Sequence, residues 1–366
     1  MTAGFYSPLP PARTGVADYA AALLAEMRRF GEVAPHAPGG VNLYHLGNNQ
    51  LHRAIYQRAL GRPGVAVLHD AVLHHFFLGS LDQPAYVEEF IYNYGTWSED
   101  LARALWAGRA RSAAEPRYFA YPMLRRIAEA SLAVVVHNPA AARMVREHAP
   151  AALVREIPHL LLPGEAPAYE AERLRRSWDA PAGAAIFGVF GHLRESKRIA
   201  TVLRAFERVR RAAPGTRLLL AGEFASRDLE RSFAARPAPP GLIRIGRTGA
   251  ARFAALLSAA DVCVNLRYPD AGETSGIVIR AMAAGKAVIV TSGEAASRFP
   301  EAACVRIDPG PAEEDMLAET MLWLGQSRAA RAAMGAAARD YVRSAHSPEA
   351  AARLYWELLR HIGGEA

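Results

Sequence analysis

The stretch Arg267–Thr291 has the residue types, in the order, that an anion-binding site needs. A turn-rich loop brings in an acid at Glu273, and Thr274–Gly276 then supplies small residues of the kind that begin a helix. The pattern is helical up to Gly285, and the β-branched run after it predicts a buried strand. A helix start offers unpaired N–H groups and a positive dipole end, so we predict that this one binds an anion, most often a phosphate.

A second loop, Phe190–Lys197, follows another predicted strand and is suited to the same kind of anion. Gly191 allows the backbone to turn tightly, and Lys197 lies where the next helix begins. A lysine directed into a crevice supplies a point charge for phosphate. The alternative is an ordinary solvated lysine, and this loop by itself favours that alternative.

A histidine follows the apolar run Val65–Leu68, which predicts a buried strand that ends at His69-Asp70. In parallel sheets the ligand crevice lies at the carboxyl ends of the strands, so His69 is a candidate functional residue. Asp70 is expected to orient His69 or to cap the next helix. Gly15 lies in a proline-rich loop, Ser7–Asp18, where it forms a simple turn or lets the backbone approach a phosphate or an acceptor.

Four further polar residues have structural explanations. His74 and His75 are neighbours on a predicted helix, where adjacent side chains point apart, so we predict no metal site there. His137 and Asn138 follow the predicted strand Leu132–Val136. They border the same crevice or, in the simpler interpretation, Asn138 caps the following helix.

Strands that alternate with helices must position these residues. The loop at the N-terminus is followed by a predicted helix, Tyr19–Phe30, and most later strands end in polar residues. This alternation predicts an α/β fold with two doubly wound parallel sheets, one in each half of the chain. The predicted strands are Val41–Leu46, Val65–Leu68 and Leu132–Val136 in the first half, and Ile186–Phe190, Arg217–Ala221, Leu242–Ile245, Val262–Leu266, Ala287–Val290 and Cys304–Ile307 in the second.

A segment rich in Pro and Ala, Pro158–Ala185, interrupts the alternation and predicts a connection between two domains. We therefore predict a first domain over residues 1–157 and a second over residues 158–345. Both are Rossmann-like, and we expect them to face each other across a deep cleft. A final amphipathic helix, Pro348–His361, lies within residues 346–366.

The composition excludes several functions. The chain has 366 residues, 51% hydrophobic and 22% charged, as in an ordinary globular protein with a full core. It has no apolar run of the roughly 20 residues that a membrane span needs, and no signal-peptide pattern at its N-terminus. The net charge of +7 forms no dense basic block, so nucleic acid is not an expected partner. Cys263 and Cys304 are interpreted as reduced core residues of a cytoplasmic protein.

These motifs together resemble one known family. The pairing of G-x-L-x-x-x-K at Gly191–Lys197 with GETSG…AMAAGKAVIVT resembles family-4 retaining glycosyltransferases of the GT-B fold. The opening SPLPPARTGVADY, the Gly47–Asn49 loop and VLHDAVLHH at Val67–His75 resemble a bacterial branch of it. The resemblance implies that the first domain binds the acceptor and the second a nucleotide-sugar donor. It also implies that the helix within 346–366 crosses back to the first domain.

The resemblance implies roles for individual residues. Lys197 would bind the donor's diphosphate and stabilise the negative charge on the leaving group, together with the helix start after Glu273. Glu273 would stand at the first glutamate of the family's paired-Glu motif, near the donor sugar's hydroxyls; alternatively it is an acid stabilised by the helix dipole. His69 would face the donor sugar, and the base would lie by the loop after Leu242–Ile245. The residues implied in donor or nucleotide binding are Gly15, Gly191, His192, Gly246, Arg247, Thr274, Ser275, Gly276 and Arg280.

The sequence departs from the family at two positions. His192 stands where the family commonly has Arg, and a histidine donates to phosphate only when a suitable nitrogen is protonated. The second glutamate of the paired motif, which usually holds the nucleotide ribose, is replaced by Arg280 or Ala281, depending on how the motif is counted. Arg280 meets a phosphate instead, or it pairs with an acid such as Asp261; both are hypotheses.

We therefore predict a retaining hexosyltransferase that moves a sugar from a UDP- or GDP-linked donor to a glycan or lipid-linked acceptor, as in polysaccharide biosynthesis. Protein groups would stabilise the diphosphate, so neither a catalytic metal nor another cofactor is expected. The expected location is the cytoplasm, and a weak attraction to anionic lipid at the inner face of the membrane stays open. The aromatic segment Ala85–Arg111 meets a lipid-linked acceptor or forms core, and core is the preferred interpretation.

Three alternatives remain. Another enzyme on the same fold, such as a phosphorylase or a sugar-nucleotide epimerase, would use similar phosphate contacts. A degenerate GT-B partner subunit that only binds would explain the changes at His192 and Arg280. An oxidoreductase is disfavoured because FGVFGHL lacks the G-x-G-x-x-G spacing of a dinucleotide-binding turn.

Overall fold

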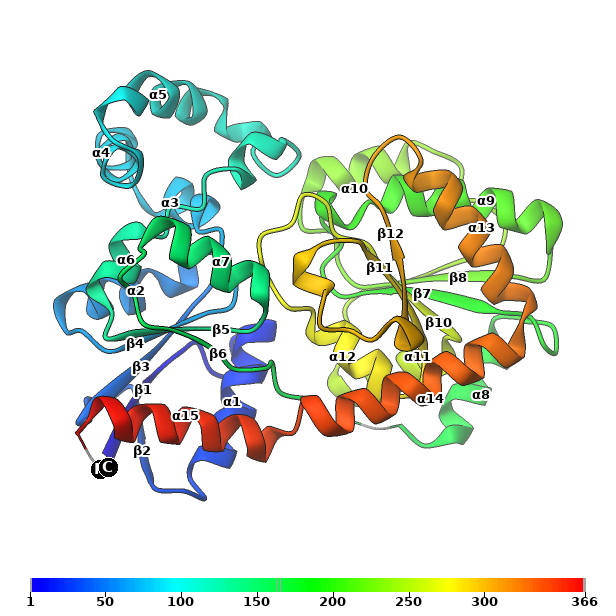
Figure 1. Cartoon of the computed structure of the whole chain (residues 1–366). Helices are drawn as coiled ribbons and strands as arrows, with labels where there is room; N and C mark the ends of the chain where they lie inside the picture. The colour runs from blue at the N-terminus through cyan, green and yellow to red at the C-terminus, as the bar shows by residue number, and fades with distance from the viewer. Residues whose placement is uncertain (1, 163, 165, 365–366) are drawn as a thin grey trace. The chain divides into compact units, whose positions relative to one another are not determined.

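The computed structural model describes residues 2–162, 164 and 166–364. The chain divides into two compact units. Unit 1 consists of Met1–Leu162, Pro269–Thr274 and His346–Ala366, and unit 2 of Pro163–Tyr268 and Ser275–Ala345. Each unit is built on a six-stranded sheet that is covered by helices (Figure 1). The predicted pair of doubly wound parallel sheets is therefore confirmed.

The units differ in extent from the predicted domains. The first segment of unit 1 continues to Leu162, whereas the prediction ended the first domain at residue 157. Pro269–Thr274, which the prediction placed in the second domain, belongs to unit 1, as does the C-terminal segment from His346. The acidic loop before the predicted anion site is thus part of one unit, and the helix after it is part of the other.

The sheet of unit 1 has the parallel strand order β2-β1-β3-β4-β5-β6. Its inner strands β3, β4 and β5 are buried at every position, as expected where helices cover both faces of a parallel sheet. The strands are β1 (Thr2–Tyr6), β2 (Glu32–Pro35), β3 (Val41–Leu46), β4 (Val65–Leu68), β5 (Ala133–Val136) and β6 (Val154–Glu156).

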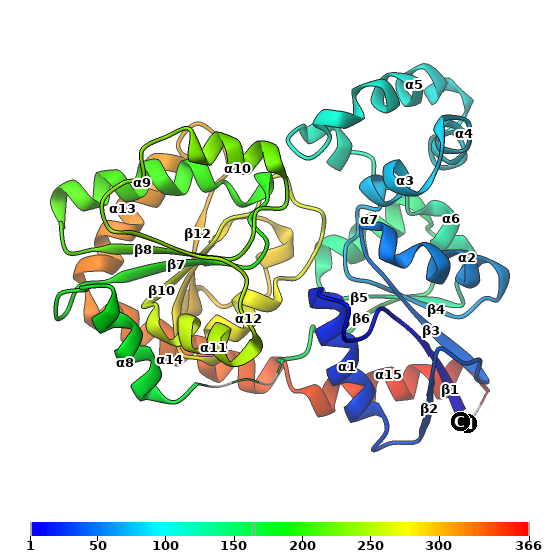
Figure 2. The ribbon, with the colours of Figure 1, turned by 180° about the vertical axis from the view of Figure 1, so that it is seen from behind.

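The first and last helices of the chain, α1 (Gly15–Met27) and α15 (Pro348–Ile362), pack against each other in unit 1 (Figure 2). Both contribute buried side chains to the core that includes β1, β3, β4 and β5. The hydroxyls of Tyr19 and Tyr355, which are fully buried, lie 3.1 Å apart. The last helix of the chain therefore completes the core of unit 1.

Helix α1 begins at Gly15, earlier than the predicted start at Tyr19. The hydroxyl of Thr14 accepts a hydrogen bond from the N–H of Ala17 at 3.1 Å and caps the helix. The prolines that forbid helix in this loop all precede the cap, so they do not prevent an earlier start. The prediction extended the loop too far because it overlooked this cap.

A helical segment separates β4 from β5, and its aromatic residues divide between core and surface. Tyr86 and Phe90 are fully buried, so the preferred interpretation as core is correct for them. Trp97 is 75% exposed and is not part of that core. The remaining helices of unit 1 are α2 (Arg53–Gly61), α3 (His74–Ser80), α4 (Gln83–Tyr94), α5 (Glu99–Gly108), α6 (Arg125–Ala130) and α7 (Pro139–His148).

The sheet of unit 2 has the parallel strand order β12-β11-β10-β7-β8-β9, and its strands match the predicted ones to within a residue. The order reverses between β7 and β10, which are neighbours although they are distant in the sequence. Ligands bind at such a switch point, beyond the carboxyl ends of the strands. The strands are β7 (Ile186–Phe190), β8 (Arg217–Ala221), β9 (Leu242–Ile245), β10 (Val262–Asn265), β11 (Ala287–Thr291) and β12 (Cys304–Ile307).

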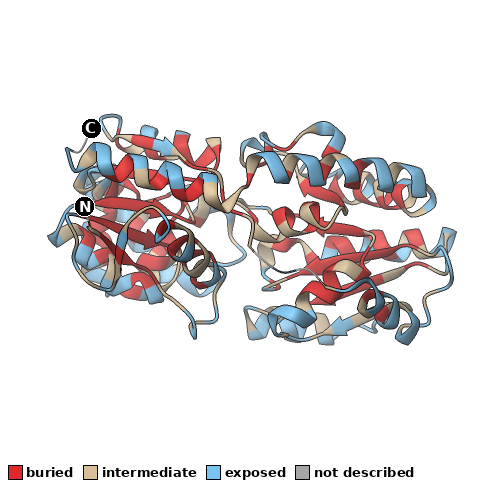
Figure 3. Cartoon of the chain, turned by 90° about the horizontal axis from the view of Figure 1, so that it is seen from below, coloured by how far each residue is buried: buried red, intermediate tan, exposed pale blue. Residues whose placement is uncertain are grey.

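Helices cover both faces of this second sheet, and buried residues run through both sheets (Figure 3). The predicted connection Pro158–Ala185 contains helix α8 (Ala168–Ser177), which packs on α11 (Ala250–Ala259). None of the described helices is both long and apolar enough to cross a membrane. The other helices of unit 2 are α9 (Ile199–Ala212), α10 (Arg227–Ala234), α11 (Ala250–Ala259), α12 (Gly276–Ala283), α13 (Glu313–Gln326) and α14 (Arg328–Ala345).

Candidate functional site

The loop after β7 lies against the first turn of α12 in unit 2. Gly191 has a φ of +83°, and a Cβ built there would lie 2.5 Å from Cδ1 of Ile277 and 4.0 Å from Nζ of Lys197. A larger residue would be strained at this φ and would press on the side chain of Ile277 in the first turn of α12. The glycine permits Lys197 and the helix start to approach each other at the switch point of the sheet.

Lys197 is a buried cation. It is 4% exposed, and its Nζ donates a hydrogen bond to the carbonyl oxygen of Phe190 at 2.5 Å. Burial raises the pKa of the Cys263 thiol in β10 to about 12, and the nearby charge of Lys197 opposes that rise. The ammonium thus lies among residues of β7 and β10. The alternative interpretation of Lys197 as a solvated lysine is wrong.

The start of α12 is fixed by Ser275. The hydroxyl of Ser275 accepts a hydrogen bond from the N–H of Val278 at 3.4 Å and so acts as the N-cap. The same oxygen lies 3.4 Å from the side chain of Asn265, the last residue of β10, and 3.4 Å from that of Arg267, which follows the strand. The predicted role of Ser275 as a helix start is confirmed, and its hydroxyl is used to hold the helix in place.

His192 and Arg247 bring two more polar side chains to the same edge of the sheet. The pKa of His192 lies below its ordinary value because the ring is partly withdrawn from water and the cations Arg194 and Arg247 are near it. At neutral pH the ring is therefore uncharged and can donate one N–H. Gly246, in the loop after β9, has open space where a Cβ would lie, so packing does not require a glycine there.

Arg280 lies over the ring of Phe253, with its guanidinium carbon 4.4 Å from the ring centroid. The hypothesis that it pairs with Asp261 is wrong. The carboxylate of Asp261 accepts hydrogen bonds from Arg175 at 2.8 Å and from the N–H of Ile186 at 2.7 Å. Because these bonds hold α8 to β7, Asp261 is a structural residue, and contact of Arg280 with phosphate stays a prediction.

Substitution of this carboxylate tests its structural role. We expect Asp261→Asn to lower the free energy of unfolding by about 1–2 kcal/mol, because two charge-assisted hydrogen bonds become weaker or are lost. Urea denaturation measures the change. Glu170→Gln, which removes the more exposed ion pair with Arg173, serves as the control and should have little effect. Equal losses in the two variants would contradict the assignment.

The acidic loop Pro269–Thr274 is held on unit 1. The N–H of Ala71, which follows β4, donates a hydrogen bond to the carbonyl of Ala271 at 2.8 Å. Gly272 has a φ of +70°, and a Cβ built there would lie 2.8 Å from Cβ of Ala71. Within the loop, the carboxylate of Glu273 accepts the N–H of Ala271 at 3.0 Å. Close backbone approach and internal hydrogen bonds therefore fix the conformation around Glu273.

Asn138 connects this loop to the end of β5. Its Nδ2 donates to the carbonyl of Gly272 and to the hydroxyl of Thr274, both at 2.9 Å. Its Oδ1 accepts the N–H of Ala141 at 3.0 Å and caps α7. The predicted capping role is confirmed, but sequence reasoning missed the second role. A polar residue at the end of a predicted parallel strand was the available signal.

His69 lies at the carboxyl end of β4 and is 8% exposed. The backbone N–H of His69 donates a hydrogen bond to the carbonyl of Leu46 at 2.9 Å, and this bond extends the pairing of β3 and β4. Nε2 of His69 lies 3.0 Å from Nδ1 of His45, and the ring stands edge-on to Tyr19 at 4.8 Å. Burial and the neighbouring histidines, His137 foremost, hold the pKa of His69 well below its ordinary value. The ring is therefore neutral.

His69 belongs to a group of buried histidines that makes unit 1 sensitive to acid. Burial lowers the pKa of His45, His74 and His159 to about 3 and that of His137 to about 4, from 6.5. The unfolded chain takes up protons below pH 6.5 that the folded chain excludes. The stability is therefore full above that pH and is lost as the pH falls.

We expect the free energy of unfolding to decrease by up to about 1.4 kcal/mol per pH unit for each such histidine between about pH 6 and pH 4. Urea denaturation over this range measures the slope. In the variant His74→Phe, the free energy of unfolding should decrease less steeply with falling pH, by the contribution of one histidine. A slope that is identical in the variant and the natural protein would contradict the assigned neutral state.

Asp70 and its neighbours fix a different loop. Oδ2 of Asp70 accepts the N–H of Asn48 at 2.8 Å, and α3 has no side-chain cap, so the predicted capping role of Asp70 is wrong. Nε2 of His74 lies 2.7 Å from the hydroxyl of Tyr86, and Nδ2 of Asn48 lies 3.2 Å from Nδ1 of His75. Among the described residues, no three His, Cys, Asp or Glu side chains are placed to hold a metal ion.

The structure thus groups most predicted residues in two sets. In unit 2, the loop after β7 brings Gly191 and Lys197 to the start of α12, with His192 and Arg247 near each other. In unit 1, the residues after β4 and β5 carry His69 and hold the loop that contains Glu273. Gly15, exposed at the start of α1, has open space where a Cβ would lie, so packing does not require a glycine there.

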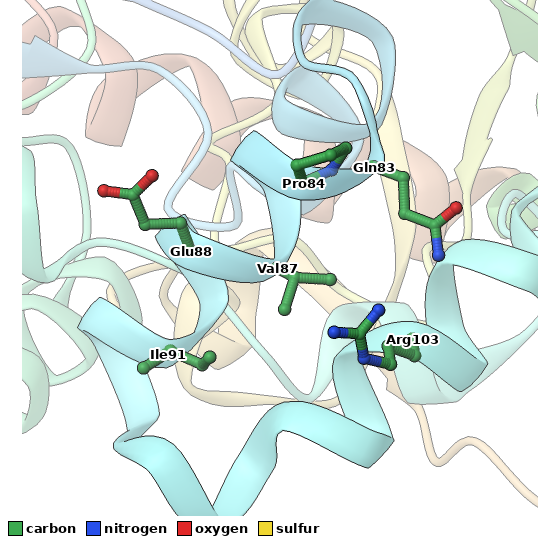
Figure 4. A pocket seen from close by; sticks show the side chains of 6 residues that line it. All are labelled: Gln83, Pro84, Val87, Glu88, Ile91 and Arg103. Carbon is green, nitrogen blue, oxygen red and sulfur yellow. The ribbon is translucent and has the colours of Figure 1, made fainter.

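A hollow of about 530 Å³ lies elsewhere in unit 1, between α4 and α5 (Figure 4). Apolar side chains of Pro84, Val87 and Ile91 line it, and the charged groups of Glu88 and Arg103 stand at its sides. It contains none of the predicted site residues.

Comparison with known proteins bears on the fold and the family. Residues 184–326 match the family model described as glycosyl transferases group 1. No curated protein matches the chain in sequence. The matched residues span all of the unit 2 strands and include Lys197, Glu273 and Arg280.

Solved structures extend the likeness over nearly the whole chain. HepE from Anabaena, in complex with UDP-glucose, has 16% identity and a TM-score of 0.66, with 99% of this chain and 100% of that chain covered. Sucrose-phosphate synthase from Thermosynechococcus elongatus has 16% identity and a TM-score of 0.71 over the full length of both chains. WaaG, a glycosyltransferase involved in lipopolysaccharide biosynthesis, has 16% identity and a TM-score of 0.59, with 97% and 99% covered.

These likenesses confirm the GT-B fold, with its two Rossmann-like sheets. The motifs in the loops after β7 and β10, which carry part of the sequence resemblance, lie within the matched residues, and the motifs in the first half of the chain lie outside them. Residues 184–326 are thus similar to the glycosyl transferases of group 1, and the solved structures show that the chain as a whole has the GT-B fold.

Proposed function

We propose that the chain is a retaining glycosyltransferase that moves a hexosyl unit from a nucleotide-diphosphate sugar to a glycan or lipid-linked acceptor. One observation carries the proposal. The buried ammonium of Lys197 lies at the switch point of a parallel sheet, where a glycine lets its loop meet the first turn of α12. A fixed positive charge and a helix N-terminus in one place suit a diphosphate.

These groups would act mainly on the leaving group. As the bond from the anomeric carbon to the diphosphate breaks, negative charge grows on the diphosphate. Preorganised positive groups stabilise that charge more in the transition state than in the ground state, and so they increase kcat. Because Lys197 and α12 supply this stabilisation, we propose that the reaction needs neither a catalytic metal nor a further cofactor.

The residues of unit 1 would hold the donor sugar. We assign contacts with its hydroxyls to His69 and to Glu273, whose loop is fixed by Ala71 and Asn138. We propose that the acceptor hydroxyl oxygen bonds to the anomeric carbon from the side that the leaving group vacates, as the bond to the diphosphate breaks, and that its proton passes to the departing diphosphate oxygen. Transfer would then retain the anomeric configuration.

The remaining donor contacts follow from the loops at the same sheet edge. His192, neutral at pH 7, would donate one hydrogen bond to a phosphate oxygen. Gly246 and Arg247 would contact the base, and the complex of HepE with UDP-glucose supports uracil. The role of WaaG in lipopolysaccharide biosynthesis supports a glycan or lipid-linked acceptor. We place the reaction in the cytoplasm, as the two reduced, buried cysteines suggest.

A donor panel tests the proposal. We expect UDP or a UDP-sugar to raise the melting temperature, since a ligand at about 100 times its Kd stabilises the folded state by about 2.7 kcal/mol. The matching UDP-sugar should be hydrolysed slowly without an acceptor, and inorganic phosphate should not speed this. Acceleration by phosphate would indicate a phosphorylase instead. No shift with any nucleotide would favour a degenerate binding subunit.

A further inference from the structure

The neighbour of His69 in the sheet is a second histidine. His45 lies on β3, and its Nδ1 is 3.0 Å from Nε2 of His69 at the end of β4. His45 is fully buried. The rings are 5.3 Å apart and nearly parallel. Because both rings are neutral, one of the two facing nitrogens must carry the shared proton and the other must accept it.

The other nitrogen of His45 decides which one carries it. Nε2 of His45 is sealed from solvent and has no hydrogen-bond partner among the described residues. A proton on Nε2 would leave a buried N–H without an acceptor, which is rarer in proteins than a buried acceptor without a donor. The proton of His45 therefore lies on Nδ1 and is donated to His69.

Two nearby histidines show the same arrangement. Nδ1 of His52 lies 2.9 Å from the carbonyl of His45, and Nδ1 of His137 lies 2.9 Å from the carbonyl of Ile157. Carbonyl oxygens only accept, so both rings carry their protons on Nδ1. In both, Nε2 is buried without a partner among the described residues. This part of unit 1 thus already accommodates buried imidazoles of that form.

We propose that His45 is a positioning residue which, by donating to Nε2 of His69, forces His69 to carry its own proton on Nδ1. This inference rests on the proposed function, in which His69 contacts the donor sugar. Nδ1 of His69 has no hydrogen-bond partner among the described residues and is not one of the sealed atoms, so it is the nitrogen that a ligand can reach.

The consequence concerns the chemistry of His69. A ring with its accessible nitrogen protonated donates a hydrogen bond to a sugar hydroxyl oxygen and cannot remove a proton from it. His69 would orient the donor sugar and would not act as a general base. Its other neighbours, the rings of Tyr19 at 4.8 Å and His137 at 5.2 Å, hold the plane of the ring in place.

Nitrogen NMR of protein labelled at histidine tests the proton position directly. We expect His69 to show a protonated Nδ1 and an unprotonated Nε2 near neutral pH. The variant His45→Phe should lose this preference, and kcat/KM should fall by about 2- to 12-fold, the effect of one hydrogen bond to the substrate. The variant His45→Asn, whose amide reaches the place of Nδ1, should recover most of the activity. His45→Gln, whose amide reaches the place of Nε2, should not.

The outcomes separate the inference from the function on which it rests. A proton on Nε2 of His69 in the natural protein would overturn the inference, whatever the activity. Recovery of kcat/KM in His45→Gln but not in His45→Asn would overturn the inference as well. His74→Phe, which replaces another fully buried histidine, is the control and should keep both the spectrum of His69 and the kcat/KM. Failure of every donor would disprove the proposed function and leave the NMR result valid.

Discussion

Replacing Lys197 with methionine should reduce kcat/KM for sugar transfer by about 10²–10³-fold, the effect of removing one preorganised group that stabilises a transition-state charge. Most of the loss should be in kcat, because the charge on the diphosphate develops as the bond breaks. Methionine has a similar length and suits a buried site, so the fold should persist. Steady-state kinetics with the donor found in the panel measures the change.

The chain offers a matched control, because its only other lysine is also withdrawn from water. Nζ of Lys286 donates to the carbonyl of Ser258 at 2.6 Å, as Nζ of Lys197 does to the carbonyl of Phe190. Lys286→Met removes the same kind of hydrogen bond, away from the loops of the candidate site. It should change the melting temperature similarly and leave kcat nearly unchanged. Equal losses of kcat in both variants would show that Lys197 is only structural.

The second large effect is expected at Asn138. Asn138→Asp keeps the oxygen that caps α7 but replaces the NH₂ group that holds Gly272 and Thr274. A carboxylate there would face a carbonyl oxygen, so the loop that carries Glu273 should shift. We expect kcat/KM to fall by about 10²-fold, because a displacement of about 1 Å in a positioning group can cost that much.

Another asparagine that caps a helical turn provides the control for Asn138→Asp. Asn49 caps its helical turn through Oδ1, which accepts the N–H of Leu51 at 3.0 Å, so Asn49→Asp also preserves a cap. That variant should retain activity, and both should retain helix content by circular dichroism. Thr274→Val removes only one of the two acceptors of Asn138 and should give an intermediate loss. Full activity in Asn138→Asp would contradict the role of the loop.

The sequence predicted the parts of the site that are local. Gly191 and Lys197 lie on one loop after a strong apolar strand, and Ser275 begins a helix with a clear periodic pattern. Strands β7 to β12 are each four or five residues long and mostly apolar, so their limits could be predicted. In contrast, β2 ends in Pro35, and β6 has only three residues, so neither gave a pattern.

Contacts between distant residues could not be predicted in this way. Asn138 holds Gly272 across 134 positions of sequence, and nothing in the local pattern at either residue indicates the other. The wrong pairing of Arg280 with Asp261 has the same cause. Asp261 was an example of an acid that Arg280 could pair with, but Arg175, on a helix in the predicted connection, forms the ion pair with Asp261.

The position of α15 affects how the chain can fold as it is synthesised. Tyr355, Leu358 and Leu359 are buried against α1 and the sheet of unit 1, yet they follow all of unit 2 in the sequence and leave the ribosome after it. By then the ribosome has already released all of unit 2. The N-terminal half must therefore wait with an incomplete core while the second half folds, and exposed apolar surface of this kind is what chaperones bind. Truncation before α15 should therefore destabilise unit 1, which contains the N-terminal half of the chain, although the deleted residues follow unit 2 in the sequence.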